Sequence, residues 1–427
     1  AHGAKSWRYW DVNPGATSGR MSFKDQVDTV DKLLKSAVVR RLESDVPLGS
    51  FLSAGIDSGL VSAMAADSLG EPLRTFTVGF DGDSEGVDER PLARMVSERY
   101  GTDHRELFLS TEDTIPLPQL IWNAGEPFAD VSVLPAHQIS RMARNDITVA
   151  LTGDGGDESF GGYANVYAAY FGSKVKRWVP TSIRNNMEKL ISRSIRDVST
   201  PSPVHRLGTL LKFAEKSPIE LYDLPEWWNS KLRSDLYALE RRTANPSDSP
   251  LRIVEQTLAS AQNLDDVTQI LYTDLHLRLP GDYLTKIDIA SNAVALEVRS
   301  PFLDHDLVEF AASLPIDSRL RGWKQKGMLR SLATRYLPKE SLNRKKTGFG
   351  PPLASWLRGK WAPLVQRLVT DGIANRAEWF DRSTILRTVD EHMSGRINHA
   401  SRLWSLVCLE VWWRLFIDKT MKPTDQL

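Results

Sequence analysis

The sequence has a single cysteine and no long apolar run, and both shortages exclude whole classes of protein. With only Cys408 among its 427 residues, the chain cannot form an internal disulfide framework, which favours a reducing cytoplasm. Cys408 lies in the apolar helical run LWSLVCLEVWW, so we expect a buried structural thiol rather than a nucleophile. No apolar stretch approaches the roughly 20 residues that a membrane span requires, and we expect no signal peptide. We therefore expect a cytoplasmic protein with no membrane partner.

An excess of charge of either sign is also missing. The sequence holds 54 basic and 54 acidic side chains, so its formal net charge is zero, and nothing indicates nucleic acid as a partner. What remains is the composition of a globular protein, with 41% hydrophobic and 25% charged residues. A chain of 427 residues is long enough for two domains or for one large elaborated domain.

The stretch from Pro47 to Ala66, PLGSFLSAGIDSGLVSAMAA, is the strongest functional signal. An apolar run ending at Leu52 indicates a buried strand, small residues follow at Ser53–Gly59, and apolar residues then recur at helical spacing. A strand, tight turn and helix can cradle phosphate, because backbone N–H groups and the helix N-terminus point at one anion. Neither a Walker loop nor a GxGxxG motif is present. The turn carries Asp57 instead, and a carboxylate beside phosphates indicates an intervening Mg²⁺.

Three further segments have the pattern of strands and alternate with helices. The expected strands are Leu73–Phe80, His104–Leu109 and Ile147–Leu151, and the expected helices cover 22–43, 88–100 (ended by Gly101) and 132–145. This alternation predicts the α/β class, with a doubly wound parallel sheet. Ligands bind such sheets outside the carboxyl ends of the strands, which is where the turn after Leu52 lies.

The segment 151–163, LTGDGGDESFGGY, follows the last of these strands. Its five glycines permit close backbone approach, and Asp154, Asp157 and Glu158 place three carboxylates within five residues. Taken alone, such a segment would be a solvated turn. Because it shares a sheet edge with Asp57, it can instead place Asp157 opposite Asp57 across one Mg²⁺.

Both segments resemble one known family. The turn is similar to the SGGxDSS pyrophosphate loop (PP-loop) of ATP pyrophosphatases, and 151–163 to the SGEGSDE segment of asparagine synthetase B. Ala54 and Gly59 depart from the loop pattern, and the hydroxyl missing at Gly59 removes one phosphate contact. The resemblance implies the adenine nucleotide alpha hydrolase-like (PP-loop) fold with a large all-helical C-terminal extension.

The resemblance also implies roles for individual residues. Asp57 and Asp157 would hold the metal, and Asp154 stands where relatives carry a Glu thought to take a proton from the attacking amine. ATP would be contacted by Leu52, Ser53, Gly55, Asp57, Ser58, Val78, Thr152 and Gly153.

Two more segments resemble the family in its order along the chain. Residues 126–132, EPFADVS, are similar to DEPFADPS and make Glu126 and Asp130 candidate pocket residues, with Glu158 a further substrate candidate; solvated loop positions are the alternative. Residues 282–304 are similar to KxDRASMAxSLExRxPFLD. There, Asp288, Glu297 and Arg299 form either a buried charge network or a substrate-carboxylate clamp around Arg299.

Two basic segments complete the resemblance. Lys326 begins KGMLR, similar to the KxxLR of the family, and Lys346 lies in RKKTGFGPP, similar to RxKxGF. Such charge runs are often solvated faces. The family match implies that Lys346 contacts the α-phosphate and the acyl oxygen, and that Lys326 steadies the departing pyrophosphate.

The implied activity is an ATP-dependent amide-forming ligase. A carboxylate, aspartate in the simplest case, would be adenylated with release of pyrophosphate, and ammonia would then displace AMP. The expected organisation is a linker over 1–20, a PP-loop core over 21–180 and a helical lobe over 181–427. The ammonia would come from glutamine through a glutaminase domain or subunit. That glutaminase was truncated from this chain, is a separate chain, or is absent. A homodimer is also possible.

Two other interpretations stay open. One is a specialised ligase of the same fold acting on a different carboxylate, as β-lactam synthetases and lasso-peptide cyclases do; the Tyr that β-lactam synthetases carry at the Asp154 position weighs against that enzyme. The other is a non-catalytic nucleotide-binding homologue, which Ala54 and Gly59 favour. Retention of Asp57, Asp157 and Lys346 argues against it.

Overall fold

The computed structural model describes most of the chain. Its described residues are 4–15, 21–80, 88–110, 116–178, 180, 216–223, 227–242, 249–343 and 350–427. In this part of the chain, no helix combines the length and the apolar character needed to cross a membrane.

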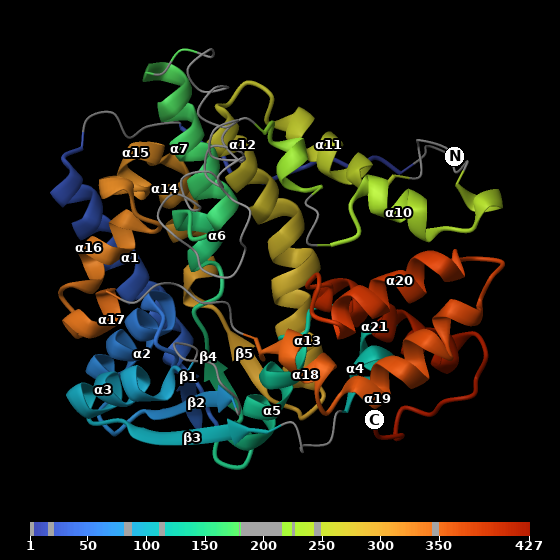
Figure 1. Cartoon of the computed structure of the whole chain (residues 1–427). Helices are drawn as coiled ribbons and strands as arrows, with labels where there is room; N and C mark the ends of the chain where they lie inside the picture. The colour runs from blue at the N-terminus through green and yellow to red at the C-terminus, as the bar shows by residue number, and fades with distance from the viewer. Residues whose placement is uncertain are drawn as a thin grey trace.

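A five-stranded parallel sheet lies in the lower left part of the view in Figure 1 and carries helices on both faces. Its strands lie in the order β3-β2-β1-β4-β5, and their bounds are β1 Leu48–Phe51, β2 Arg74–Phe80, β3 Asp103–Leu109, β4 Val149–Leu151 and β5 Glu297–Arg299. Ser50 of β1 is in register with Thr75 on one side and with Leu151 on the other. The strand order therefore reverses between β1 and β4, and the segments that follow these two strands leave the same edge side by side.

The fifth strand corrects the sequence-based expectation. The segment after residue 180 was expected to be all-helical, but β5 pairs with β4 through Val149 opposite Glu297 and Leu151 opposite Arg299. Three residues, two of them charged, are too few to show the alternation that marks a strand. The division into a core and a lobe at residues 180 and 181 stays a prediction, because residues 181–215 lie outside the described part.

Helices cover one face of the sheet with a continuous apolar core. This layer contains α1 Phe23–Leu42, α2 Ile56–Ser68, α3 Arg90–Tyr100, α14 His305–Ser313 and α16 Gly327–Ala333, whose Leu34, Leu60, Leu307 and Leu329 are fully buried together. Ser22 caps α1 by accepting a hydrogen bond from the Asp25 N–H. Gly101 ends α3 in the left-handed conformation at φ 61°, as expected from the sequence.

The other face is covered by a second apolar layer. It contains α4 Leu117–Ala124, α5 Val133–Ala143, α13 Thr285–Asn292 and α21 Ala400–Phe416, and it receives the alternate residues Phe76, Val78 and Phe80 of β2. The doubly wound arrangement is thus confirmed. Cys408 is fully buried in this layer, where burial raises the pKa of its thiol, in agreement with a structural role.

A long helical run stands beside the sheet. It passes without a break from α12 Asp266–Thr273 through the π-helix η5 Asp274–Leu284 into α13, which contacts β5 (Figure 1). The remaining described helices are α6 Gly156–Phe160, α7 Ala164–Trp178, η2 Ile219–Leu221, α10 Ser230–Leu236, η3 Leu239–Arg241, α11 Leu251–Ser260, η6 Pro301–Leu303, α15 Ile316–Arg319, η7 Arg321–Trp323, α17 Lys339–Asn343, α18 Leu353–Arg358, α19 Ala362–Val365, η8 Gln366–Thr370, η9 Ile373–Asn375 and α20 Arg382–Met393.

Candidate active site

A cavity of about 750 Å³ lies at the carboxyl ends of β1, β2 and β4. This volume is within the range typical of small-molecule sites, roughly 300–1,000 Å³. Twelve of the residues predicted from the sequence line it together: Leu52, Ser53, Gly55, Asp57, Ser58, Val78, Thr152, Gly153, Asp154, Asp157, Glu158 and Lys326. The structure therefore brings the two predicted loops to one site, while the roles assigned to these residues stay predictions.

Hydrogen bonds fix the loop that follows β1. The hydroxyl groups of Ser53 and Ser58 lie 2.7 Å apart, and the Ser53 N–H donates to Ser58 Oγ over 3.1 Å. The Gly55 N–H donates to Ser53 Oγ over 3.0 Å. Gly55 is the N-cap of α2 and supplies no capping side chain, so the positive end of the helix dipole faces the cavity. This arrangement suits an anion such as phosphate.

Glycines allow the two loops to pack backbone against backbone. A Cβ atom at Gly153 would lie 2.7 Å from the Ser58 nitrogen, and one at Gly156 would lie 2.7 Å from Asp57 Cγ. Both separations are too short for any side chain at those positions. The glycine-rich segment is therefore required by the close approach of β4's loop to Asp57, as its composition indicated.

Lys326 connects the two loops through their carboxylates. Its Nζ lies 2.7 Å from Asp157 Oδ1 and also pairs with Asp57 Oδ2. The side chain is buried and extends from a backbone in the left-handed conformation, φ 54°, immediately before α16. Burial lowers the pKa of Lys326, but Asp157 and Asp57 raise it by more, so the ammonium stays charged.

The same two carboxylates fit the predicted metal. Because Asp57 and Asp157 both contact one ammonium nitrogen, their oxygen atoms can reach one shared cation. Carboxylate oxygens are ligands that Mg²⁺ prefers, and this ion normally retains several water molecules and binds substrate phosphates. Two protein carboxylates at the mouth of a phosphate loop are sufficient for such a site.

Two further acids in the cavity bind protons more tightly than usual. Glu158 is only 2% exposed, and its carboxylate accepts a hydrogen bond from the Tyr163 hydroxyl. Burial raises the pKa of Glu158 to about 7, against the lowering effect of that hydrogen bond. Burial also raises the pKa of Asp154. Glu158 can therefore gain or lose a proton near neutral pH, a property that its sequence position did not reveal.

Sequence reasoning missed the cavity wall built by η5 and α13. Here Arg278, Asp282, Tyr283 and Lys286 line the cavity beside Tyr163 of the loop before α7. Lys286 Nζ pairs with Asp130 Oδ2 over 3.1 Å, which keeps the pKa of Asp130 low although burial acts to raise it. Lys286 opens the KxD part of the segment 282–304 and was a usable signal. Arg278 lies in a π-helical turn, whose spacing no helical-period pattern identifies.

The structure places two candidate substrate residues outside the cavity lining. The Arg299 guanidinium donates to the backbone carbonyls of Arg41 and Glu43 over 3.0 and 2.7 Å and pairs with Glu297 over 2.6 Å. It therefore ties β5 to the end of α1 and does not line the cavity, so this geometry does not support the clamp. A buried charge network is not seen among the described residues either, because Glu297 is exposed and Asp288 bonds Asn292 instead. Glu126 is exposed between α4 and α5 and does not line the cavity, whereas Asp130 does. Lys346 lies outside the described residues.

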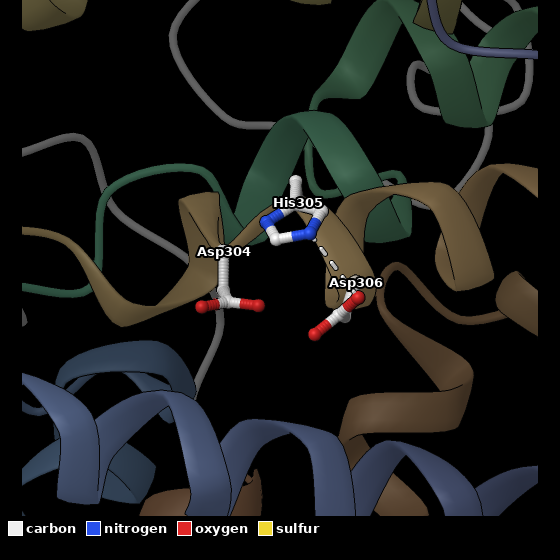
Figure 2. A group of neighbouring side chains, drawn as sticks. All are labelled: Asp304, His305 and Asp306. Carbon is white, nitrogen blue, oxygen red and sulfur yellow. Dashed lines mark ion pairs between the residues drawn. The ribbon is translucent and has the colours of Figure 1, made fainter.

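A separate group of possible metal ligands lies at the start of α14. Figure 2 shows Asp304, His305 and Asp306, with His305 Nε2 lying 3.3 Å from Asp306 Oδ1. Arg40 and Arg41 of α1 already pair with the Asp304 carboxylate over 2.6 and 3.0 Å. Two guanidinium groups neutralise this carboxylate, so the group is an ion-pair network that joins α1 to α14.

Comparisons with known proteins agree with this geometry. The sequence model of the asparagine synthase family matches residues 29–414. Over 414 residues the chain is 26% identical to asparagine synthetase [glutamine-hydrolyzing] 1 of Bacillus subtilis, which covers 95% of this chain and 63% of that protein. Over 404 residues it is 30% identical to a putative asparagine synthetase [glutamine-hydrolyzing] of Mycobacterium tuberculosis, which covers 93% of this chain and 59% of that protein.

A fungal protein with a different name is also similar. The chain is 26% identical over 409 residues to amidase chyE of Penicillium rubens, which covers 85% of this chain and 58% of that protein. In each of these three comparisons the chain spans about three fifths of the relative's length.

Proposed function

The chain belongs to the asparagine synthase family, and from this membership we propose that it is an ATP-dependent ligase that forms amides. In the proposed reaction a carboxylate attacks the α-phosphate of ATP and releases pyrophosphate. Ammonia then displaces AMP from the acyl-adenylate to give the amide. Aspartate is the simplest acceptor, and asparagine would be the product.

The observation that carries this proposal is that Lys326 contacts both Asp57 and Asp157 at the edge of the sheet where the strand order reverses between β1 and β4. Two carboxylates and one ammonium lie together at the N-terminus of α2, in a cavity large enough for a nucleotide and a small acceptor. Asp57 and Asp157 would hold Mg²⁺, which would neutralise phosphate charge when bound. Ser53, Ser58 and the start of α2 would bind the pyrophosphate part of ATP, and Thr152 and Gly153 would contact adenosine.

In the proposed reaction, acidic residues of the loop that follows β4 would accept the proton. The attacking amine must lose a proton, and Asp154 was assigned this role by resemblance. Glu158 is a second candidate, because its pKa of about 7 matches the working range of a general base. Lys346 would stabilise charge that develops on the α-phosphate and the acyl oxygen.

The ammonia source, the partners and the location are parts of the same proposal. Glutamine would supply ammonia through a glutaminase domain or subunit, as the names of the bacterial relatives suggest, and free ammonium would replace it in the test tube. A cytoplasmic location is consistent with the lone buried Cys408. The alternative is a specialised ligase that uses the same site to form an amide from a different carboxylate.

The test is product analysis with a panel of carboxylates. The protein is incubated with ATP, Mg²⁺, ammonium and each carboxylate in turn, and amides are identified by mass spectrometry. We expect asparagine from aspartate, and no amide from the Lys346→Ala variant. Amide formation from another member of the panel alone would favour the specialised ligase, and ATP binding without any amide would favour the non-catalytic homologue.

A further inference from the structure

A second cavity lies on the other side of helix α5 from the candidate active site. Its volume is about 250 Å³, and its walls come from the start of α4, from α5, from the turn after α13 and from residues 423–426 near the C-terminus, which lies beside α4 in Figure 1. Ala136 and Ile139 of α5 line the candidate active site, whereas His137 and Arg141 line the second cavity. With 3.6 residues per turn, these two pairs lie on opposite sides of the helix.

Arg141 brings a positive charge to the second cavity. Its side chain is exposed, and it forms no hydrogen bond or ion pair with the residues that the structure describes. His137 precedes it by four positions, so both side chains lie on the same face of α5. A guanidinium carries a fork of N–H donors that fits a carboxylate through two parallel hydrogen bonds. Arg141 can therefore bind the carboxylate of a ligand.

His137 brings a buried hydrogen-bond acceptor. The residue is only 4% exposed, and its Nδ1 lies 3.2 Å from the carbonyl oxygen of Ala290. Because a carbonyl can only accept, Nδ1 carries the proton and donates. Burial lowers the pKa of His137 against the raising effect of that bond, so the ring is neutral at pH 7. In a neutral ring Nε2 is an acceptor, and here it has no partner within the described part of the chain.

Asp425 places a carboxylate in the same cavity. Its Oδ2 accepts a hydrogen bond from the Lys422 N–H over 2.9 Å, and the Asp425 N–H donates to the Lys422 carbonyl over 3.1 Å. This turn holds the carboxylate in place and leaves Oδ1 without a partner in the described ranges. A compact cavity of this volume is about 8 Å across, so one small molecule can contact both Arg141 and Asp425.

These three side chains together select a molecule that carries both charges. A simple anion would be attracted by Arg141 and repelled by Asp425, and a simple cation would meet the opposite conflict. A carboxylate at one end and an ammonium group at the other satisfy all three, provided that the ammonium has N–H groups to donate to Asp425 and His137. The cavity is smaller than the roughly 300–1,000 Å³ typical of drug-sized ligands, and Pro116 and Val294 form part of its wall, so only a small side chain fits.

We propose that the second cavity binds a free α-amino acid with a small side chain. Its carboxylate would bind Arg141, and its ammonium group would donate to Asp425 and to Nε2 of His137. The proposal goes beyond the ligase function and does not rest on it, because the second cavity is separate from the one in which ATP and the acceptor are expected. The ligand would contact α5 on the side opposite to the candidate active site.

The experiment is titration calorimetry of the full chain with glycine and L-serine, without ATP. The control ligands are acetate, which has no ammonium group, and glycine betaine, whose ammonium group has no N–H. The variants are Arg141→Gln and Asp425→Asn, with Arg144→Gln as the matched control, because Arg144 is also exposed at the end of α5 and does not line the second cavity. All three side chains are exposed, so the variants should keep the melting temperature of the wild type.

We expect glycine and L-serine to bind the wild type and Arg144→Gln equally. Binding to Arg141→Gln and to Asp425→Asn should be weaker by about 10-fold, because each variant loses one charged contact. Failure of both amino acids to bind the wild type, or binding that is unchanged in either cavity variant, would overturn the proposal. Acetate or glycine betaine binding as tightly as glycine would also overturn it, because the cavity would then not require an ammonium group with N–H donors. Amide formation plays no part in this measurement, so the ligase proposal and this one fail separately.

Discussion

The Lys326 ammonium lies 2.7 Å from the Asp157 carboxylate and joins it to the loop that follows β1. Asp157 and Asp57 come from segments 100 residues apart in the sequence, and each would repel the other without a cation between them. One buried lysine therefore holds together the two halves of the candidate site.

We predict that Lys326→Met lowers stability and increases the response to Mg²⁺. Breaking a buried ion pair by removing one partner costs on the order of 3 kcal/mol, because the remaining carboxylates are left facing each other. A divalent cation can replace the lost charge, so Mg²⁺ should raise the melting temperature of the variant more than that of the wild type. Thermal denaturation across a Mg²⁺ titration checks this, with Lys324→Met, an exposed neighbour, as the control. An equal Mg²⁺ response in all three proteins would contradict the shared-cation site.

Gly156→Ala should damage nucleotide binding while leaving the fold intact. Its new Cβ would lie 2.7 Å from Asp57 Cγ, so the Asp57 carboxylate must leave its present position. We expect the dissociation constant for Mg²⁺–ATP to rise at least 10-fold, which corresponds to about 1.4 kcal/mol. The control is Gly70→Ala beyond the end of α2, where nothing lies within 4 Å of the added atom. Unchanged ATP affinity in Gly156→Ala would show that the contact between the loops is unimportant for binding.

Glu158 should make the protein less stable as the pH rises. Because the folded protein holds the pKa of Glu158 at about 7, above its ordinary value of 4.5, the folded state retains a proton that the unfolded state has lost between these values. The free energy of unfolding therefore falls through this window, by roughly 3 kcal/mol in total, and the loss is complete about one pH unit above 7.

Glu158→Gln should remove this dependence. Urea denaturation at pH 5 and at pH 8 measures it, and we expect the variant to gain stability relative to the wild type at pH 8 but not at pH 5. A relative stability that is the same at both pH values would mean that Glu158 titrates normally in the folded protein.

Arg299→Leu should affect stability and not substrate binding. The variant loses two hydrogen bonds to the backbone carbonyls of Arg41 and Glu43, whose removal we expect to cost roughly 1–3 kcal/mol. Glu297→Gln breaks only the ion pair between Arg299 and the half-exposed Glu297 carboxylate, and it should cost less than 1 kcal/mol. Urea denaturation and acceptor titration distinguish the two effects. A weakened acceptor with unchanged stability would restore the clamp interpretation.

Sequence reasoning succeeded where short-range chemistry determines structure. The phosphate loop, the glycine-rich segment and the end of α3 at Gly101 each depend on a few adjacent residues, and parallel strand order then brings the first two together. Their placement at one cavity therefore required no knowledge of distant contacts.

The parts that could not be predicted depend on long-range contacts. Strand β5 is a strand only because β4 lies beside it, and its three residues carry no pattern of their own. Arg299 bonds to carbonyls more than 250 positions away, and the basic motif around Lys326 does not reveal that two carboxylates enclose it. The Arg278 guanidinium lies over the rings of Tyr163, in the loop before α7, and Tyr283, in the π-helix η5, and these two residues are far apart in the sequence.

The central claim is that a carboxylate is activated by cleavage of ATP between its α- and β-phosphates at the Asp57 and Asp157 site. The most direct measurement is nucleotide product analysis with Mg²⁺–ATP, ammonium and aspartate, for the wild type and for Asp57→Asn. The account predicts AMP and pyrophosphate in equal amounts, formed only when the carboxylate is present, and neither product from the variant. Formation of ADP and phosphate, or ATP cleavage that is independent of every carboxylate in the panel, would contradict it.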